Sequence, residues 1–316
     1  MRTRILGVVA LSLATAACGT TQQKRVATGG LTGLGAGAII GGPVGAVVGT
    51  AVGAAGGAVL PEDATTIANN MLGRTHHAAS VALGTPDFAL ALEQHARYCD
   101  ALERCGLSLT RLADDPRHPD ATFVEDTAVL SARCNVLARP GAPSRAGEVS
   151  AIRGALASAA VTLVAIEAPG TLDGGDVCEH GDQFFIGVSQ RTNWDGAAQL
   201  AALLTKAGYE SSCVDIRAVP GILHLKSGIA SLGDERIVAI DALSGHPALR
   251  GRDIVRVPPG EEYAANCVRV NDHLLVPAGF PGMQRTLEVL GYTLVPLEMS
   301  EFRKMDGGLS CLSLRF

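Results

Sequence analysis

From residue 61 onward, apolar positions form short strand-like runs that alternate with longer helical patterns. The strand-like runs are "LSLTRL", "TFVEDTAVL", "NVLAR", "VTLVAIE", "DQFFIGVS", "SSCVDIRAV", "RIVAID" and "CVRVNDHLLVPAG". Helical patterns cover about 145–158, 194–208 and 281–291, and another helix is predicted from Thr85 and Pro86 to just before Gly106. Strand pairs alternate with single helices about every fifty residues, which suggests a repeated ββαβ unit. The periodicity itself supports a mixed α/β fold.

The segment before residue 61 has a different pattern. Val26 to Leu60 contains no charged residue, and glycine occupies every fourth position. Positions four apart share one face of a helix, so these glycines would let two backbones approach closely, as in small-xxx-small packing in membranes. With Pro43 near the middle, residues 19–60 are predicted to form a helical glycine-zipper hairpin in a membrane; a flexible Gly/Ala linker is the alternative. The eight glycines are Gly29, Gly33, Gly37, Gly41, Gly45, Gly49, Gly53 and Gly57.

The chain starts with "MRTRILGVVALSLATAACGTT", which has the order of parts of an export signal. Arg2 and Arg4 precede an apolar stretch, and small residues lead to Cys18. Residues 1–18 are therefore predicted to be a lipoprotein-type signal, which would place the protein in the cell envelope as a membrane-anchored lipoprotein. Thr15 departs from the leucine usual at that position. An uncleaved anchor or a wrongly chosen start codon are the alternatives, and the latter would make the protein cytoplasmic.

Composition narrows the function of residues 61–316. The chain has 316 residues with 26 Lys+Arg against 31 Asp+Glu, and the basic residues are scattered, so no nucleic-acid partner is predicted. Eight irregularly spaced cysteines without a CxxC motif are typical of a reducing compartment, which conflicts with the export signal. No phosphate-binding glycine loop and no metal-ligand spacing occur in the sequence, so neither metal nor cofactor is predicted.

Four stretches place polar or reactive residues inside apolar runs: "PDATFVEDTAVL", "GTLDGGDV", "ILHLKSG" and "DGGLSC". Burying charge costs several kcal/mol unless the group pairs with or serves something. Glu125 and Asp126, as neighbours on a predicted strand, would point to opposite faces. The residues concerned are Asp120, Glu125, Asp126, Asp173, Asp176, His224 and Cys311.

Each of these features has an ordinary structural explanation. A lone histidine is commonly a satisfied core group, an isolated cysteine a small core residue, and a carboxylate pair a salt-bridge partner. Together, a nucleophile, an acid/base and several carboxylates suggest a cysteine hydrolase that acts on a cation.

Seven motifs resemble those of the dimethylarginine dimethylaminohydrolase family, in order and spacing, from about Leu83 to the last residue. They are "PDATFVEDTAVL", "RPGAPSRAGE", "GTLDGGDV", "FFIGVSQRTN", "LHLKSG", "AANC" and "MSEFRKMDGGLSCLSLRF". The resemblance implies that residues 61–316 form the five-bladed α/β-propeller (pentein) of the guanidino-group-modifying enzymes. It also implies conversion of asymmetric dimethylarginine, a small-molecule substrate, to citrulline and dimethylamine without a cofactor, and it leaves a homodimer open.

By this resemblance three residues would carry the reaction. Cys311 would be the nucleophile and form a covalent thiouronium. His224 would act as general acid and then as base, and Asp173 would take the family's carboxylate position beside the guanidinium.

Five further residues would bind the substrate by the same resemblance. Asp126 would grip the guanidinium, with Asp120 and Glu125 in the same pocket. Arg145 and Arg191 would bind the α-carboxylate, a role that suits the bidentate fork of arginine.

The resemblance weakens at "TTIANNMLGRTHHAAS", residues 65–80, where the family has an apolar first strand and a lid leucine. Asn69 and Asn70 would interrupt the strand, and the lid position falls at about Ala78, so no lid residue is transferred. Two alternatives therefore stay open: an arginine deiminase-like guanidine hydrolase and a catalytically inactive envelope lipoprotein.

Overall fold

The computed structural model describes Leu6–Ala10 and residues 83–316, except residues 114, 116, 119, 160 and 234. The predicted glycine-zipper hairpin at 19–60 and the stretch 65–80 lie outside the described residues, as does most of the predicted signal. None of the helices in the described part is both long and apolar enough to cross a membrane.

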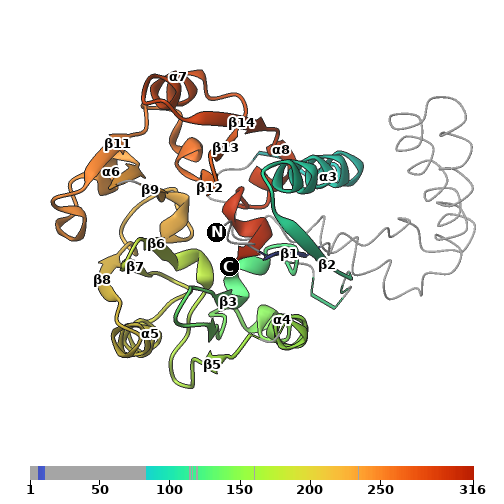
Figure 1. The fold of residues 1–316 in the computed structure, drawn as a ribbon, viewed down its shortest axis with the longest axis vertical. Coiled ribbons are helices and arrows are strands. Elements are labelled where there is room, and N and C mark those ends of the chain that lie inside the picture. The colour runs from blue at the N-terminus through green and yellow to red at the C-terminus, as the bar shows by residue number, and fades with distance from the viewer. Residues whose placement is uncertain are drawn as a thin grey trace, which may run out of the picture.

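The strands of the described residues form five three-stranded sheets that share one pattern. In each sheet the central strand runs antiparallel to the first strand and parallel to the third. Figure 1 shows the five sheets placed around a common centre. The sheets are β3 (Ala128–Val129), β4 (Val136–Leu137) and β5 (Val164–Ala165); β6 (Val177–His180), β7 (Gln183–Val188) and β8 (Glu210–Asp215); β9 (Ile229–Gly233), β10 (Arg236–Ala239) and β11 (Asp253–Arg256); β12 (Val268–Val270), β13 (His273–Pro277) and β14 (Thr293–Leu297); and β15 (Ser313–Arg315), β1 (Leu6–Ala10) and β2 (Ser108–Leu112).

In chain order, each central strand is followed by a helix and then by the third strand. These helices are α3 (Phe88–Arg104), α4 (Glu148–Ser158), α5 (Trp194–Lys206), α6 (Asp241–Ser244) and α7 (Pro281–Val289), and a short helix α8 (Ser300–Arg303) is additional. The four predicted helices are confirmed, whereas the one-turn helices α6 and α8 are too short for a periodic pattern to reveal. The cap of α3 is Asp87, whose Oδ1 accepts the Leu90 amide at 3.0 Å, rather than Thr85.

The sheet that contains β1 joins the two ends of the described chain. β1 runs antiparallel to β15, with Val8 opposite Leu314, and parallel to β2, with Val8 opposite Thr110. The sequence analysis assigned these five residues to an export signal and sought the first strand of the enzyme at 65–80. The structure instead gives Leu6–Ala10 the central position of the sheet.

A short 3₁₀ turn precedes the first strand of every sheet. The five turns are η1 (Val124–Thr127), η3 (Gly174–Asp176), η4 (Leu225–Ser227), η6 (Glu262–Ala265) and η7 (Ser310–Leu312), and they gather near the centre in Figure 1. The expectation that Glu125, Asp126, His224 and Cys311 lie within strands is therefore wrong. They lie on these turns or cap them, because the strands that follow are only two to five residues long and the apolar run continues through each turn.

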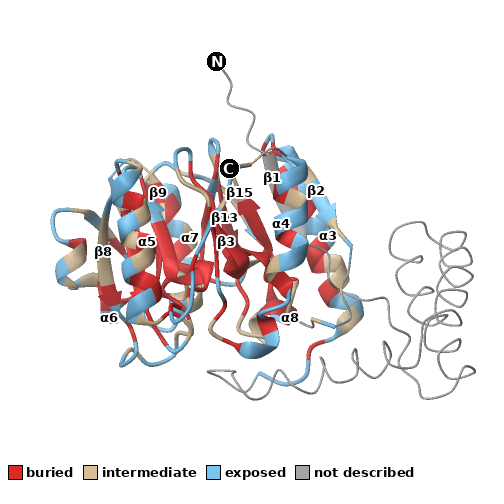
Figure 2. Cartoon of the chain, turned by 90° about the horizontal axis from the view of Figure 1, so that it is seen from below, coloured by how far each residue is buried: buried red, intermediate tan, exposed pale blue. Residues whose placement is uncertain are grey.

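Apolar side chains fill the space between neighbouring sheets and beneath the helices. Phe184 and Phe185 are adjacent on β7, point to opposite faces and belong to different buried clusters. Burying such side chains stabilises the fold by roughly 1.5–3 kcal/mol each. Figure 2 shows buried residues concentrated on the strands and exposed residues on the outer surfaces of helices α3, α4 and α5. The cores thus hold each sheet, and the turn that precedes it, in place.

Candidate active site

A buried histidine lies between two buried carboxylates at the centre of the five turns. His224, which caps η4, has Nε2 3.0 Å from Asp173 Oδ2 and 3.9 Å from Asp126 Oδ1. Asp173 caps η3, and its Oδ1 accepts the Gly141 amide at 2.9 Å. The structure thus brings together three residues that are far apart in the sequence, as expected.

The two glycines of "DGGD" permit this close packing. A Cβ on Gly174 would lie 2.1 Å from the Glu125 carbonyl oxygen, and one on Gly175 would lie 2.6 Å from Asp126 Oδ1 and 2.9 Å from the His224 ring. These glycines therefore permit the close approach of the segments that carry Asp126, Asp173 and His224.

Asp126 is held by a chain of buried ion pairs. Arg145 Nη1 contacts Asp126 Oδ2, and the amide of Gly175 donates to Asp126 Oδ1 at 2.9 Å. On its other side, Arg145 donates to Glu148 from Nε at 3.0 Å and from Nη2 at 2.7 Å. Arg145, predicted to bind the substrate carboxylate, is therefore engaged by two carboxylates of the protein and braces Asp126.

Glu125 faces the opposite direction from Asp126, as predicted, although the two lie on a turn. One oxygen, Oε1, contacts Lys226 Nζ at 2.6 Å and Arg315 Nη2 at 3.5 Å, and the other accepts from Ser310 Oγ at 2.7 Å. Glu125 therefore reaches the turn that carries Cys311.

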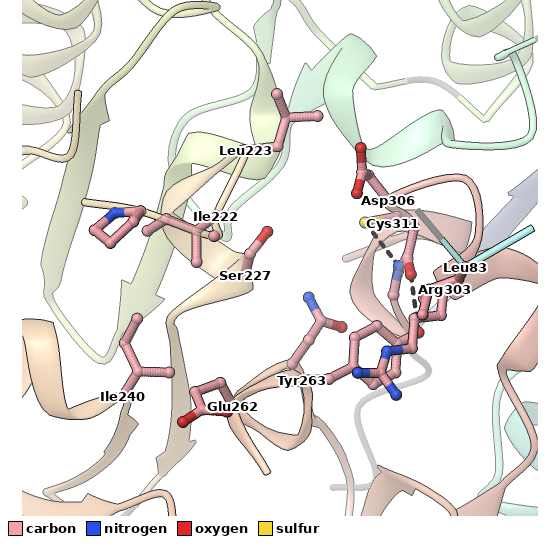
Figure 3. Close-up of a pocket in the computed structure, with 15 residues that line it drawn as sticks. Leu83, Ile222, Leu223, Ser227, Ile240, Glu262, Tyr263, Arg303, Asp306 and Cys311 are labelled. Carbon is pink, nitrogen blue, oxygen red and sulfur yellow. Dashed lines mark hydrogen bonds between the residues drawn. The ribbon is translucent and has the colours of Figure 1, made fainter. Parts of the chain in front are cut away.

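Cys311 lies on η7 and lines a cavity of about 370 Å³ (Figure 3). Its Sγ accepts the Gly308 amide at 3.4 Å. Other lining residues include Ile222 and Leu223 just before His224, and Asn266, Tyr263 and Arg303. The guanidinium of Arg303 stacks over the Tyr263 ring at 4.9 Å. Among the sequence-predicted residues, the described lining includes only Cys311.

Burial and the surrounding charges set the protonation of His224 and Cys311. Burial by itself would lower the pKa of His224, but the charges of Asp126, Asp176 and Asp173 raise it to about 9. For Asp126, burial opposes ionisation, and the charges of His224 and Arg145 nevertheless lower its pKa. Burial, followed by the charges of Glu125 and Asp126, raises the pKa of the Cys311 thiol to about 12. Without substrate, the site therefore holds an imidazolium and a neutral thiol near pH 7.

Asp126, Asp173 and His224 also offer ligand atoms that all lie within 4.8 Å of one another, a spacing that a metal ion would require. Metal binding needs a neutral imidazole. The raised pKa of His224 and the ion pair between Asp126 and Arg145 both oppose it. The donor set therefore fits a cation-binding carboxylate cluster better than a built metal centre.

The remaining predicted residues lie around this centre. Asp120 contributes its backbone oxygen to Arg145 Nη2 at 3.3 Å, and Arg191 is partly exposed, with its backbone packed against Gly141. Asp176 buttresses the histidine turn, because its Oδ1 accepts the Leu225 amide at 2.9 Å.

The sequence analysis missed four residues of the site: Glu148, Lys226, Asn266 and Arg303. All four stand within the motifs that it quoted for the family resemblance. For Lys226 and Asn266, in "LHLKSG" and "AANC", a polar residue inside a buried-looking run was the available signal.

Comparisons with known proteins identify relatives of the chain. No family model matches the chain. The N(G),N(G)-dimethylarginine dimethylaminohydrolase of Pseudomonas aeruginosa is 43% identical over 235 residues, covering 74% of this chain and 91% of that protein. A Streptomyces coelicolor protein of the same name is 35% identical over 230 residues, covering 72% of this chain and 87% of that protein.

Solved structures give the same result. The Pseudomonas aeruginosa enzyme in complex with citrulline matches with a TM-score of 0.72 and 42% identity, covering 75% of this chain and 92% of that one. The N-terminal domain of a cyanobacterial arginine dihydrolase matches with a TM-score of 0.65 at 19% identity, covering 73% of this chain and 87% of that one, which shows a shared fold.

The shared fold and the identity to dimethylarginine dimethylaminohydrolases show a hydrolase that acts on the C–N bonds of guanidino groups. With 43% identity across nine tenths of a curated relative, the family is also clear. The chain belongs to the dimethylarginine dimethylaminohydrolase family.

Proposed function

We propose that this protein hydrolyses N-omega-methylated arginine, with asymmetric dimethylarginine as substrate, to citrulline and dimethylamine. The observation that carries the proposal is the buried His224 held between Asp173 and Asp126, beside turns that present Cys311 to a cavity. Two carboxylates facing one cation-binding centre suit a flat guanidinium, which donates in two directions.

In the proposed complex, Asp126 and Asp173 hold the guanidinium with its central carbon toward Cys311 Sγ. Asp120 and Glu125 add negative charge around the same pocket. Arg191 is proposed to meet the α-carboxylate, while Arg145 braces Asp126. Correct orientation of this kind converts binding into a large part of the rate enhancement.

The reaction proceeds in two steps. The Cys311 thiolate forms an S–C bond to the guanidinium carbon, the bond to the dimethylamino nitrogen breaks, and imidazolium His224 supplies the proton with which dimethylamine leaves. His224, now neutral, takes a proton from water, whose oxygen attacks the covalent thiouronium. The S–C bond then breaks, releasing citrulline and the thiolate.

The resting thiol must first release its proton to solvent, because His224 already carries one and cannot accept it. A cationic substrate next to Cys311 would offset the carboxylate charges that raise the thiol pKa, because a nearby cation favours the thiolate. The proposed substrate thus helps to activate the nucleophile.

We further infer that the five sheets form the five-bladed α/β-propeller of this family, with β1 as the central strand of the fifth blade. The repeated strand pattern and the convergence of five turns support this.

We also propose an envelope-anchored form of the protein, supported by the signal-like first residues and the glycine register at 29–57. Leu6–Ala10 cannot serve both as β1 and as part of a cleaved signal, because cleavage before Cys18 would remove β1. N-terminal sequencing of envelope and cytoplasmic fractions would show in which fraction the intact strand occurs.

The test of the activity is citrulline release from asymmetric dimethylarginine by the full-length protein, beside arginine as competing substrate. Faster turnover of the methylated substrate supports the proposal. Preference for arginine would indicate the deiminase-like alternative, and no turnover of either by folded protein would indicate the inactive lipoprotein.

A further inference from the structure

Each of the five central turns adds a side chain to the site, and the role of only one turn is still unexplained. Asp126 lies on η1, Asp173 and His224 cap η3 and η4, and Cys311 lies on η7. The remaining turn, η6, ends at Asn266, which is its C-terminal cap. Asn266 is buried and lines the cavity of the nucleophile.

The amide of Asn266 connects the turn after His224 with the turn of Cys311. Its Nδ2 donates to the Lys226 carbonyl oxygen at 2.9 Å and to Ser310 Oγ at 3.0 Å. Its Oδ1 accepts the Ser310 amide at 2.9 Å. One side chain therefore uses both donors and its acceptor to join the residue two positions after His224 to the residue directly before Cys311.

The same contacts fix the direction of a hydrogen-bond chain. Ser310 Oγ accepts from Asn266, so its own hydrogen is directed to Glu125 Oε2 at 2.7 Å. The charge of Glu125 raises the pKa of Cys311. Ser310 thus links Asn266 to Cys311 in two ways: its amide fixes the backbone of the Cys311 turn, and its hydroxyl holds the carboxylate that raises the thiol pKa.

The chain leaves room for this amide at Gly308. A Cβ on Gly308 would lie 2.6 Å from both Cγ and Oδ1 of Asn266. The Gly308 amide is also the donor to Cys311 Sγ. The second glycine of "DGGLSC" therefore has a direct reason: a side chain there would push the Asn266 amide away from the turn of Cys311.

We propose that Asn266 is a positioning residue that sets the orientation of Cys311 relative to His224. This inference rests on the proposed function for its consequence in turnover, although the effect on the thiol itself does not require a substrate. A displacement of about 1 Å at a reacting group can cost about 100-fold in rate, so an amide that ties the two catalytic segments together has a large kinetic effect.

The first experiment compares full-length protein with Asn266→Ala. We expect kcat to fall about 100-fold with KM nearly unchanged, because the carboxylates that hold the guanidinium keep their contacts. The rate of Cys311 alkylation by iodoacetamide, followed by mass spectrometry against pH, should show a displaced titration without any substrate. Gln199→Ala is the control. Gln199, on helix α5, likewise accepts from the backbone N–H of Glu167 at 2.8 Å and donates to its C=O at 2.9 Å, but it lies outside the site.

A double-mutant cycle separates positioning from simple loss of stability. Gly308→Ala should impair turnover about as much as Asn266→Ala, whereas the double variant should be no worse than either single one, because the added methyl group then has space. Additive losses would overturn the proposal.

The proposal would also be overturned by a variant with a lower melting temperature but unchanged kcat and thiol titration. The melting temperature and the titration of the thiol can both be measured whether or not the proposed function holds. A wild-type protein without turnover would overturn that function, while the alkylation profile would still test the position of Cys311.

Discussion

The histidine side and the cysteine side of the site differ in how firmly the protein holds them. His224 is buried, pairs with Asp173 at 3.0 Å and has Asp126 within 3.9 Å. Cys311 is partly exposed on the wall of a cavity, and the one hydrogen bond that its sulfur makes among the described residues is a long contact with a backbone amide. His224, the proposed acid/base, is thus preorganised by charge, whereas Cys311, the proposed nucleophile, is positioned by its turn.

The charge of Asp126 raises the pKa of both His224 and Cys311, with opposite effects on the reactivity of the two groups. Negative charge favours a protonated imidazole, which is the form that a general acid needs, and it disfavours a thiolate, which is the form that a nucleophile needs. Such a site is complementary to a bound cation. A cation bound next to Cys311 would offset this negative charge and favour the thiolate, while His224 would keep its proton.

The largest effect should come from removing the nucleophile. Cys311→Ser should lower citrulline release by about 1,000-fold or more, because no covalent intermediate can then form at a useful rate. Calorimetry should still detect substrate binding, since the carboxylates are intact. Cys213→Ser, a similarly half-buried free thiol on β8, is the control and should keep full activity. Equal loss in both variants would contradict the role of Cys311.

Removing the acid/base should cost less than removing the nucleophile. His224→Gln should reduce kcat by about 100- to 10,000-fold, the usual range for a general acid–base group. In the wild-type enzyme, kcat/KM should fall as the pH rises through about 9, where His224 loses the proton that dimethylamine needs. His180→Gln provides a buried control, hydrogen-bonded to Ser231 Oγ at 2.9 Å. An alkaline limb that persists in His224→Gln would assign it to another group.

Weakening the carboxylate support should move this limb rather than abolish activity. Asp173→Asn removes one of the groups that raise the pKa of His224, so the alkaline limb should shift to lower pH, with kcat reduced about tenfold at neutral pH. Full pH profiles of variant and wild type would measure this. Asp215→Asn, which alters an exposed pair with Arg217, should leave the profile in place.

The smallest effect is expected from removing the charge of Glu125, which contacts Ser310 on the turn of Cys311. Glu125→Gln removes a charge that raises the pKa of Cys311, so alkylation of the free thiol at pH 8 should become severalfold faster. The alkaline limb of His224 should stay where it is, because Glu125 faces away from the histidine. A slower thiol would show that loss of the contact with Ser310 outweighs the loss of charge.

The sequence predicted the helices and the catalytic types, but not the local geometry that joins them. Periodicity located α3, α4, α5 and α7, because each buries one continuous apolar face. The 3₁₀ turns were hidden, since Glu125 and Cys311 stand in apolar runs that continue into real strands. Their roles came from the family resemblance rather than from the pattern.

Two further features depend on tertiary contacts that no local pattern encodes. Arg145 looked like a free substrate ligand, but its partners Asp126 and Glu148 are brought to it only by the fold. Likewise, the pairing of β1 with β2 and β15 joins segments from opposite ends of the chain, so an apolar run at residues 5–14 fitted an export signal equally well.

The pairing of β1 also bears on how the fold forms. β1, at residues 6–10, and its antiparallel partner β15, at residues 313–315, lie far apart in the sequence. The turn η7, which carries Cys311, lies directly before β15. Pairing over such a sequence separation closes a very long loop and therefore forms slowly. The order of the Cys311 turn thus depends on one of the slowest contacts to form, and until it forms β1 lacks one of its two neighbouring strands.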